Sequence, residues 1–269
     1  MDCNITWQEV FKNVPDFELI DEEEIYKNKE DVLYFGYIHM NQILENLKED
    51  RKPKQSILVI EGGHECKHPD VPILDYLKQK NSFYQSIEWA DDIEERIKKI
   101  GNVPKVAIHY RHVHEETDQA DVKSNPFCNF SQNSPFSEFE AIVKKCKQKS
   151  FFISNSGYHK NYVKDNISSK KVVVLHHEES NDRSSRESMK KSITEFVLMS
   201  RCELIIGSYY SSFSDEATYF SLIPKYMPMR DSLESLEPFT RNYHTVFKPS
   251  EIGNAVVLNA DIKTLTKNI

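Results

Sequence analysis

Short apolar runs alternate with amphipathic stretches through the middle of the chain, and this alternation restricts the fold more than any other feature. The expected strands cover residues 105–110, 151–154, 172–175 and 203–206, and the expected helices cover residues 136–147, 159–165, 187–200 and 213–220. Strands that alternate with helices form a parallel sheet. Strands as uniformly apolar as VVVL are typical of a sheet covered by helices on both faces. The pattern predicts an α/β fold with a doubly wound parallel sheet.

The first hundred residues predict a second, smaller lobe. Residues 32–38 and 56–60 are expected to be strands, and residues 40–48 and 89–100 amphipathic helices. A chain of 269 residues is long enough for one large domain or two small ones. We place the boundary near residues 101–104. This gives an N-terminal lobe of residues 1–103 and a C-terminal lobe of residues 104–235. Residues 236–269 form a last segment, which we expect to pack back onto the first lobe.

Charge and composition exclude several classes of function. The net charge is −7, and the two signs are mixed along the chain, so no broad positive field attracts nucleic acid. The first thirty residues are acidic where a signal peptide needs a basic start, and no stretch reaches the length of a membrane span. Five widely spaced cysteines without a Cys-x-x-Cys suit free thiols. We therefore expect a cytoplasmic protein.

Two strand ends carry the residue types that bind phosphate. Ligands of open α/β sheets bind at the carboxyl ends of the strands. Arg111 follows the first strand, and a guanidinium gives a phosphate two parallel hydrogen bonds. A salt bridge from Arg111 to Glu115 or Glu116 is the simpler alternative. Residues 207–214 (GSYYSSFS) join the last strand to its helix, which suits phosphate binding at a helix N-terminus as well as plain capping by Ser212 or Ser214.

Other chemistry is less well supported. The chain contains neither GxGxxG nor GxxxxGK[ST], so the phosphate loops of Rossmann dehydrogenases and P-loop proteins are missing. Histidines gather at residues 64–68, 109–114 and 176–177, but without a familiar zinc spacing. We therefore expect no metal site, and a metal-dependent hydrolase is an alternative function. The carboxylates after Arg111 are the acid–base candidates: Glu115, Glu116, Asp118 and Asp121.

Three segments, in this order, resemble the fucosyltransferase superfamily with the GT-B fold, which includes the α1,2-, α1,6- and protein O-fucosyltransferases. Residues 106–111 (VAIHYR) are similar to its strand that ends in His-x-Arg, and residues 151–156 (FFISNS) to its second strand. Residues 195–214 (EFVLMSRCELIIGSYYSSFS) are similar to its acid-plus-Leu-x-x-Ser helix, the next strand and the Ser-Ser-Phe loop. Residues 34–37 (YFGY) with Gln42 match a first-lobe element more weakly. The resemblance covers roughly residues 100–225.

The resemblance implies a GT-B-like enzyme with two Rossmann-like lobes, the first of them shortened. It would be an inverting glycosyltransferase that moves a sugar, most simply fucose from GDP-fucose, to a hydroxyl of a glycan or glycoprotein, without metal or other cofactor. The acceptor would bind on the side of the first lobe and the nucleotide sugar in the second. The implied donor-binding residues are His109, Arg111, His112, Asn155, Glu195, Ser208, Ser211, Ser212, Phe213 and Ser214. The implied catalytic residues are Arg111, Asp118 and Glu116.

The sequence also departs from the pattern of this superfamily. His112 stands where many members have a second Arg, and Glu195 stands where they have an Asp that contacts the guanine base. Gln119 occupies the position of the proposed catalytic Glu, and the glycine-rich loop that opens the first lobe is missing. Another donor such as UDP-xylose, and a catalytically silent nucleotide- or sugar-binding module, therefore stay open as alternatives.

Overall fold

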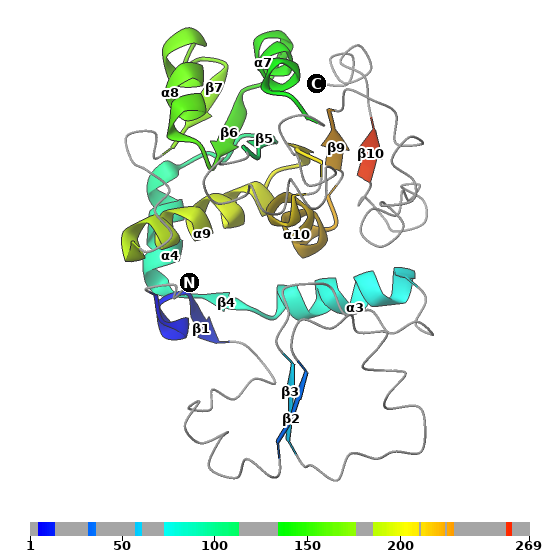
Figure 1. Ribbon diagram of the computed structural model, residues 1–269. Helices are drawn as coiled ribbons and strands as arrows, with labels where there is room; N and C mark the ends of the chain where they lie inside the picture. Colours follow the sequence, from blue (N-terminus) through cyan, green and yellow to red (C-terminus); the bar gives the residue numbers. More distant parts are fainter. Residues whose placement is uncertain are drawn as a thin grey trace. The chain divides into compact units, whose positions relative to one another are not determined.

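The computed structural model describes residues 5–13, 32–35, 57–60, 73–112, 134–175, 185–209, 211–223, 225–228 and 257–259. The chain divides into two compact units. The larger unit combines Met1–Asn13 with Lys80–Ile269, and the smaller is Val14–Gln79. Figure 1 shows the elements of each unit along the chain. The lobe boundary expected near residues 101–104 stays a prediction. Residues 80–103 belong to the larger unit by their contacts.

A six-stranded sheet forms the centre of the larger unit. Its strand order is β10-β9-β8-β5-β6-β7, and every neighbouring pair is parallel. The strands are β5 (Val106–Tyr110), β6 (Ser150–Ser154), β7 (Val172–Val174), β8 (Leu204–Gly207), β9 (Lys225–Met227) and β10 (Val257–Asn259). The predicted α/β class with a parallel sheet is confirmed. In the last segment of the chain, β10 pairs with β9 of this sheet.

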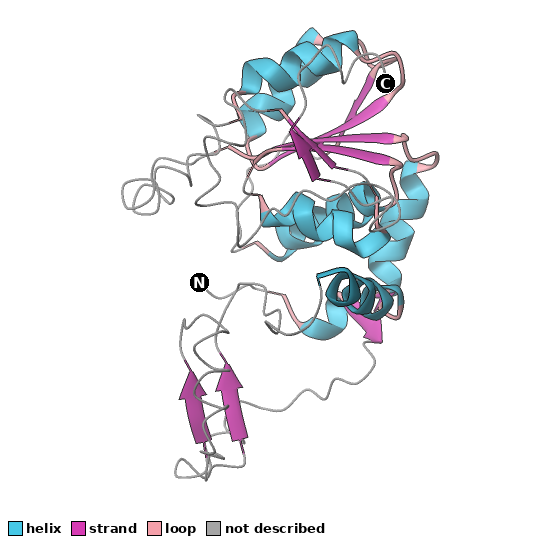
Figure 2. Ribbon diagram, turned by 90° about the vertical axis from the view of Figure 1, so that its right-hand side faces the viewer, coloured by secondary structure: helices cyan, strands magenta, loops and turns pink. Residues whose placement is uncertain are grey.

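Helices cover both faces of the sheet, as Figure 2 shows. On one face lie α7 (Phe136–Lys145) and α8 (Gly157–Asn166), and on the other α4 (Asp91–Ile100), α9 (Arg186–Ser200) and α10 (Ser212–Ser221). Residues of β5 alternate between the two cores: Val106 and Ile108 pack with α7 and α8, whereas Ala107 packs with α4 and α9. This two-sided burial explains why the strand has no polar face.

Two further contacts complete the larger unit. A short strand, β1 (Phe11–Asn13), follows the 3-10 helix η1 (Trp7–Glu9) and pairs antiparallel with β4 (Glu88–Trp89). Helix α3 (Ile73–Gln85) then contacts α10 through its last residues. Asn81 Nδ2 donates to the carbonyl oxygens of Tyr219 (3.1 Å) and Phe220 (2.8 Å), which are in the last turn of α10. A C-terminal helix turn has unpaired carbonyls, so these bonds fix α10 at its far end.

The smaller unit contains a parallel strand pair. β2 (Val32–Phe35) pairs with β3 (Ile57–Ile60), with Val32 opposite Ile57. Both strands were expected from the sequence, and the predicted helix at residues 40–48 lies outside the described residues. Within the part of the chain that the structure describes, no helix has the length and apolarity needed to cross a membrane.

Candidate functional site

The sheet reverses its winding direction between β5 and β8. From β5 the chain proceeds to β6 and β7 on one side, and it returns with β8 on the other side of β5 (Figure 1). At such a reversal the connections leave the two central strands in opposite directions, and ligands of open α/β sheets bind outside the carboxyl ends of these strands. The segments that follow β5 and β8 therefore form the candidate site.

Arg111 is held at this reversal by its backbone. Its N–H donates to Ser208 Oγ across 2.9 Å, and the N–H of Ser208 donates to the carbonyl oxygen of His109 across 3.0 Å. Ser208 is fully buried. Since Ser208 directly follows β8 and Arg111 directly follows β5, these bonds join the two strand ends. The structure thus brings together two residues that the sequence predicted for donor binding.

The next residue, His112, is fixed from the opposite side. Its N–H donates to Asn155 Oδ1 across 2.7 Å, and Asn155 Nδ2 donates back to the His112 carbonyl oxygen across 2.9 Å. Asn155 lies between β6 and Ser156, the N-cap of α8. The side chain of Asn155 therefore contacts protein backbone, which is a different use from the predicted contact with the donor.

The N-terminus of α10 lies directly after β8. Its N-cap is Ser211, which is buried and whose side chain makes no capping hydrogen bond. Capping by Ser212 or Ser214, the simpler alternative from the sequence, is therefore not what the structure contains. Ser214 Oγ instead donates to the Ser211 carbonyl oxygen (3.1 Å). Ser212 is exposed and Phe213 half-buried, so the first turn of α10 presents Ser212 at the surface.

Close packing brings α10 against the end of β8. A Cβ atom on Gly207 would lie 2.7 Å from Ser214 Oγ and 2.9 Å from Lys225 Cε. No side chain fits there without displacing one of these groups. Glycine at this position therefore lets the N-terminus of α10 approach the strand end.

A buried lysine that sequence reasoning missed lies beneath this turn. Lys225, the first residue of β9, is completely buried and donates from Nζ to the Ser208 carbonyl oxygen (3.3 Å). It also forms an ion pair with Asp215 in the first turn of α10. Lysine is almost never fully buried unless it is paired, so hydropathy predicted neither this position nor the partner. The contact ties β9, the end of β8 and α10 together.

His109 faces this cluster from inside the sheet. The residue is 3% exposed, its ring centroid is 5.3 Å from that of Phe213, and its Nδ1 has no hydrogen-bond partner among the residues that the structure describes. Burial lowers the pKa of His109 to about 3, and the charges of Lys225 and Arg111 act in the same direction. His109 is therefore neutral at physiological pH. It offers a hydrogen-bonding nitrogen rather than a positive charge.

Glu195 occupies the middle of α9 and is paired. The carboxylate is 4% exposed, and Lys160 Nζ of α8, itself 1% exposed, donates to its Oε1 across 2.7 Å. Burial raises the pKa of Glu195 to about 7, although Lys160 acts against this rise. Glu195 is thus neither a surface acid nor a first-turn helix charge. The nucleobase of a donor could reach this carboxylate only after the residues that cover it had moved. The predicted contact of Glu195 with the guanine base stays a prediction.

Two further aromatic groups at this edge were not singled out from the sequence. His159, in the first turn of α8, has its ring centroid 4.9 Å from that of His112, and its Nδ1 is 2.8 Å from Ser156 Oγ. Burial lowers the pKa of His159 to about 4, so the ring is neutral at physiological pH. Tyr158 beside it is 73% exposed. The position of His159 soon after the end of a strand was the only sequence signal for it, and many histidines that bind nothing share such a position.

Several predicted residues lie outside the described residues. They include the catalytic candidates Glu116 and Asp118, the acids Glu115 and Asp121, and most of the clustered histidines: His64, His68, His114, His176 and His177. In the described ranges, no group of three or more His, Cys, Asp or Glu side chains is placed to hold a metal ion. The expectation of a metal-free site stays a prediction.

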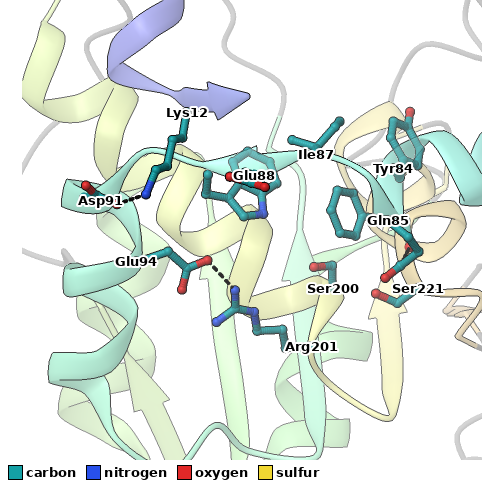
Figure 3. A pocket seen from close by; sticks show the side chains of 12 residues that line it. Lys12, Tyr84, Gln85, Ile87, Glu88, Asp91, Glu94, Ser200, Arg201 and Ser221 are labelled. Carbon is teal, nitrogen blue, oxygen red and sulfur yellow. Dashed lines mark hydrogen bonds and ion pairs between the residues drawn. The ribbon is translucent and has the colours of Figure 1, made fainter. Parts of the chain in front are cut away.

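A pocket of about 450 Å³ lies elsewhere in the larger unit. Its lining includes Ser200 and Arg201 at the end of α9 and Phe220 at the end of α10, which precede the amino ends of β8 and β9. Figure 3 shows that both positively charged side chains in this pocket are paired: Arg201 bonds to Glu94 (2.8 Å), and Lys12 to Asp91 (3.3 Å). Because the pocket is at the amino edge of the strands, it is separate from the candidate site.

The sequence matches no known family model and no curated protein significantly. Solved structures with some similarity are fucosyltransferases, the superfamily that the motifs resemble. One is NodZ alpha-1,6-fucosyltransferase soaked with GDP-fucose (TM-score 0.42, 13% identity, 75% of this chain and 60% of that one). Another is POFUT1 in complex with GDP-fucose (TM-score 0.39, 16% identity, 67% and 54%). A third is an Arabidopsis thaliana FUT1 variant in complex with GDP (TM-score 0.38, 13% identity, 74% and 51%).

The chain spans between half and two thirds of the length of these three structures.

Proposed function

We propose that this protein is a glycosyltransferase that binds a nucleoside diphosphate sugar at the carboxyl ends of β5 and β8. The observation that carries the proposal is the bond from the Arg111 N–H to Ser208 Oγ, which fixes a guanidinium-bearing residue next to the segment that begins α10. A guanidinium and the N–H groups of a helix N-terminus both bind phosphate oxygens. Ser212, exposed in the first turn, adds a hydroxyl donor.

The proposed reaction is a direct displacement at the anomeric carbon. The acceptor hydroxyl oxygen attacks this carbon, the bond from the carbon to the diphosphate oxygen breaks, and the configuration inverts. The hydroxyl proton passes to a carboxylate, for which Glu116 and Asp118 remain the candidates. Negative charge that develops on the leaving diphosphate is stabilised by Arg111 and the start of α10, because preorganised donors favour the transition state. This neutralisation requires no metal ion.

The finer assignment of the donor rests on the sequence motifs. They favour GDP-fucose, and a glycan or glycoprotein hydroxyl would be the acceptor. His109 is buried, and its neutral imidazole contacts the ring of Phe213, which is half-buried at the start of α10. Of the two, only Phe213 has appreciable exposed surface, and an aromatic ring suits the uncharged part of a nucleotide sugar better than a further phosphate.

A thermal-shift panel tests the proposal. The protein is heated with GDP, UDP and ADP, with their sugar conjugates, and with the corresponding nucleosides. We expect the diphosphates to raise the melting temperature and the nucleosides to leave it unchanged, because ligands that bind only the folded state stabilise it. Hydrolysis of the bound donor without acceptor would then separate an enzyme from a silent binding module. No shift with any diphosphate would refute the proposal.

A further inference from the structure

The side chain of Asn155 makes two hydrogen bonds to one residue on a neighbouring strand end. Its Oδ1 accepts from the His112 N–H (2.7 Å) and its Nδ2 donates to the His112 carbonyl oxygen (2.9 Å). In an extended chain the N–H and the C=O of one residue point to the same side. A side chain that pairs with both groups must therefore accept one hydrogen bond and donate another. Among side chains of this length only an amide does both without changing its protonation state, whereas an aspartate only accepts.

Ser208 holds the same short segment from the other neighbouring strand. Its Oγ accepts from the Arg111 N–H (2.9 Å), and its own N–H donates to the His109 carbonyl oxygen (3.0 Å). β5 lies between β8 and β6 in the sheet, so Ser208 and Asn155 approach the segment after β5 from opposite sides. The backbone of Arg111 and His112 is thereby fixed between two side-chain contacts, although both residues lie beyond the last residue of the strand.

We infer that Asn155 is a positioning residue, which acts with Ser208 to hold the backbone of Arg111 where its guanidinium meets the diphosphate. The inference rests on the proposed function for the identity of the ligand. A long arginine side chain has many rotamers, so a fixed Cα position limits where the guanidinium reaches. In this account Asn155 itself does not touch the donor.

The backbone part of the inference is tested without any ligand. In the Asn155→Asp variant the size of the side chain is kept, the donor to His112 is lost, and a carboxylate oxygen faces a carbonyl oxygen. Hydrogen exchange, resolved to single residues by NMR or fragmentation, should show faster exchange at the amide of Arg111, because the repulsion displaces the segment; the amide of His112 keeps an acceptor in the aspartate. Asn161→Asp is the matched control, because Asn161 is exposed on α8 and the variant adds the same charge. Unchanged exchange in Asn155→Asp would overturn the inference.

Binding of GDP, measured by titration calorimetry, tests the link to Arg111. We expect Asn155→Asp to lower the affinity for GDP about tenfold, which corresponds to the loss of one hydrogen bond. Asn161→Asp should stay within about twofold of the wild-type affinity. The combination of Asn155→Asp with Arg111→Ala should bind no more weakly than Arg111→Ala alone, since a positioning residue has no effect once the group it positions is removed.

The outcomes separate the two proposals. If the wild-type chain binds GDP, Arg111→Ala weakens this binding and Asn155→Asp leaves it intact, the positioning role is wrong and the diphosphate site stands. Full additivity of the two substitutions would also refute the positioning role. If neither GDP nor any other nucleoside diphosphate binds to the wild-type chain, the proposed function fails and the positioning role fails with it.

Discussion

The buried pair of Lys160 and Glu195 gives the sharpest stability prediction. Replacing Lys160 with Met keeps most of the side-chain volume but leaves Glu195 without its cation in a site where it is 4% exposed. The expected loss of unfolding free energy is about 3–5 kcal/mol near pH 8, the range observed when one partner of a buried ion pair is removed. Replacing both partners together, Lys160→Met with Glu195→Leu, should recover most of this loss, because the desolvation cost disappears with the charges.

The pH dependence of the unfolding free energy tests the same pair independently. The pKa of Glu195 rises from its ordinary value of 4.5 to about 7 in the folded chain. The folded state therefore binds this proton more tightly than the unfolded state, so the contribution to stability is complete below pH 4.5 and is lost as the pH rises through 7. At 1.36 kcal/mol per unit, this contribution is about 3 kcal/mol. In Lys160→Met the pKa rises further, because Lys160 opposes the rise, so the variant should differ from wild type less at pH 5 than at pH 8.

Urea unfolding followed by circular dichroism at pH 5 and pH 8 measures both effects. Lys164→Met is the matched control, since Lys164 is exposed on the same helix and its replacement should change the stability by less than about 0.5 kcal/mol. The reasoning would be refuted if Lys160→Met were no more destabilising than Lys164→Met at pH 8. Strict additivity of the Lys160 and Glu195 substitutions would refute it as well, because it would mean that the two charges do not interact.

Three further predictions concern the candidate site. Arg111→Ala should reduce sugar transfer at least about 100-fold and Arg111→Lys should restore little of it, since an ammonium lacks the two parallel donors; near-wild-type turnover of the lysine variant in a transfer assay would contradict this. Transfer should survive saturating EDTA, and a loss that manganese or zinc restores would point to a metal mechanism instead. Gly207→Ala should lower the unfolding free energy by about 1–3 kcal/mol in thermal unfolding, because its Cβ would lie 2.7 Å from Ser214 Oγ, and adding Ser214→Ala should recover part of it. An unchanged melting temperature in Gly207→Ala would show that α10 moves without cost.

The sheet was predictable because its signal is local. Each strand from β5 to β8 is a short apolar run, and each helix that follows has its own periodicity, so the order of elements from β5 to α10 was predicted from the chain itself. Strand β9 was not expected, because three residues that begin with a lysine give no apolar run. Arg111 and the Ser211–Ser214 turn were predictable for the same reason, since both lie next to a strand end. The parallel topology then brings these strand ends to one edge.

The polar contacts beneath the site were not predictable, because each joins residues that are far apart in the sequence. Lys160 and Glu195 are 35 positions apart, and Asn155 bonds to a residue 43 positions away. A lysine within a helix or at the start of a strand is expected at the surface, so the residue type alone predicts that Lys160 and Lys225 are exposed. Only the packing of α8 on one face and α9 on the other determines which charges meet.

The division of the chain has a consequence for how the protein can vary. The larger unit is interrupted: the chain leaves it after Asn13 and re-enters it at Lys80, so residues 14–79 are an insertion. The exit is secured by the pairing of Asn13 with Glu88, and the re-entry by the bonds from Asn81 to the end of α10. Closing a loop costs only about 0.6 kcal/mol more for each doubling of its length. A longer or shorter insertion would therefore change the cost of closing the larger unit by less than the net contribution of a typical hydrogen bond.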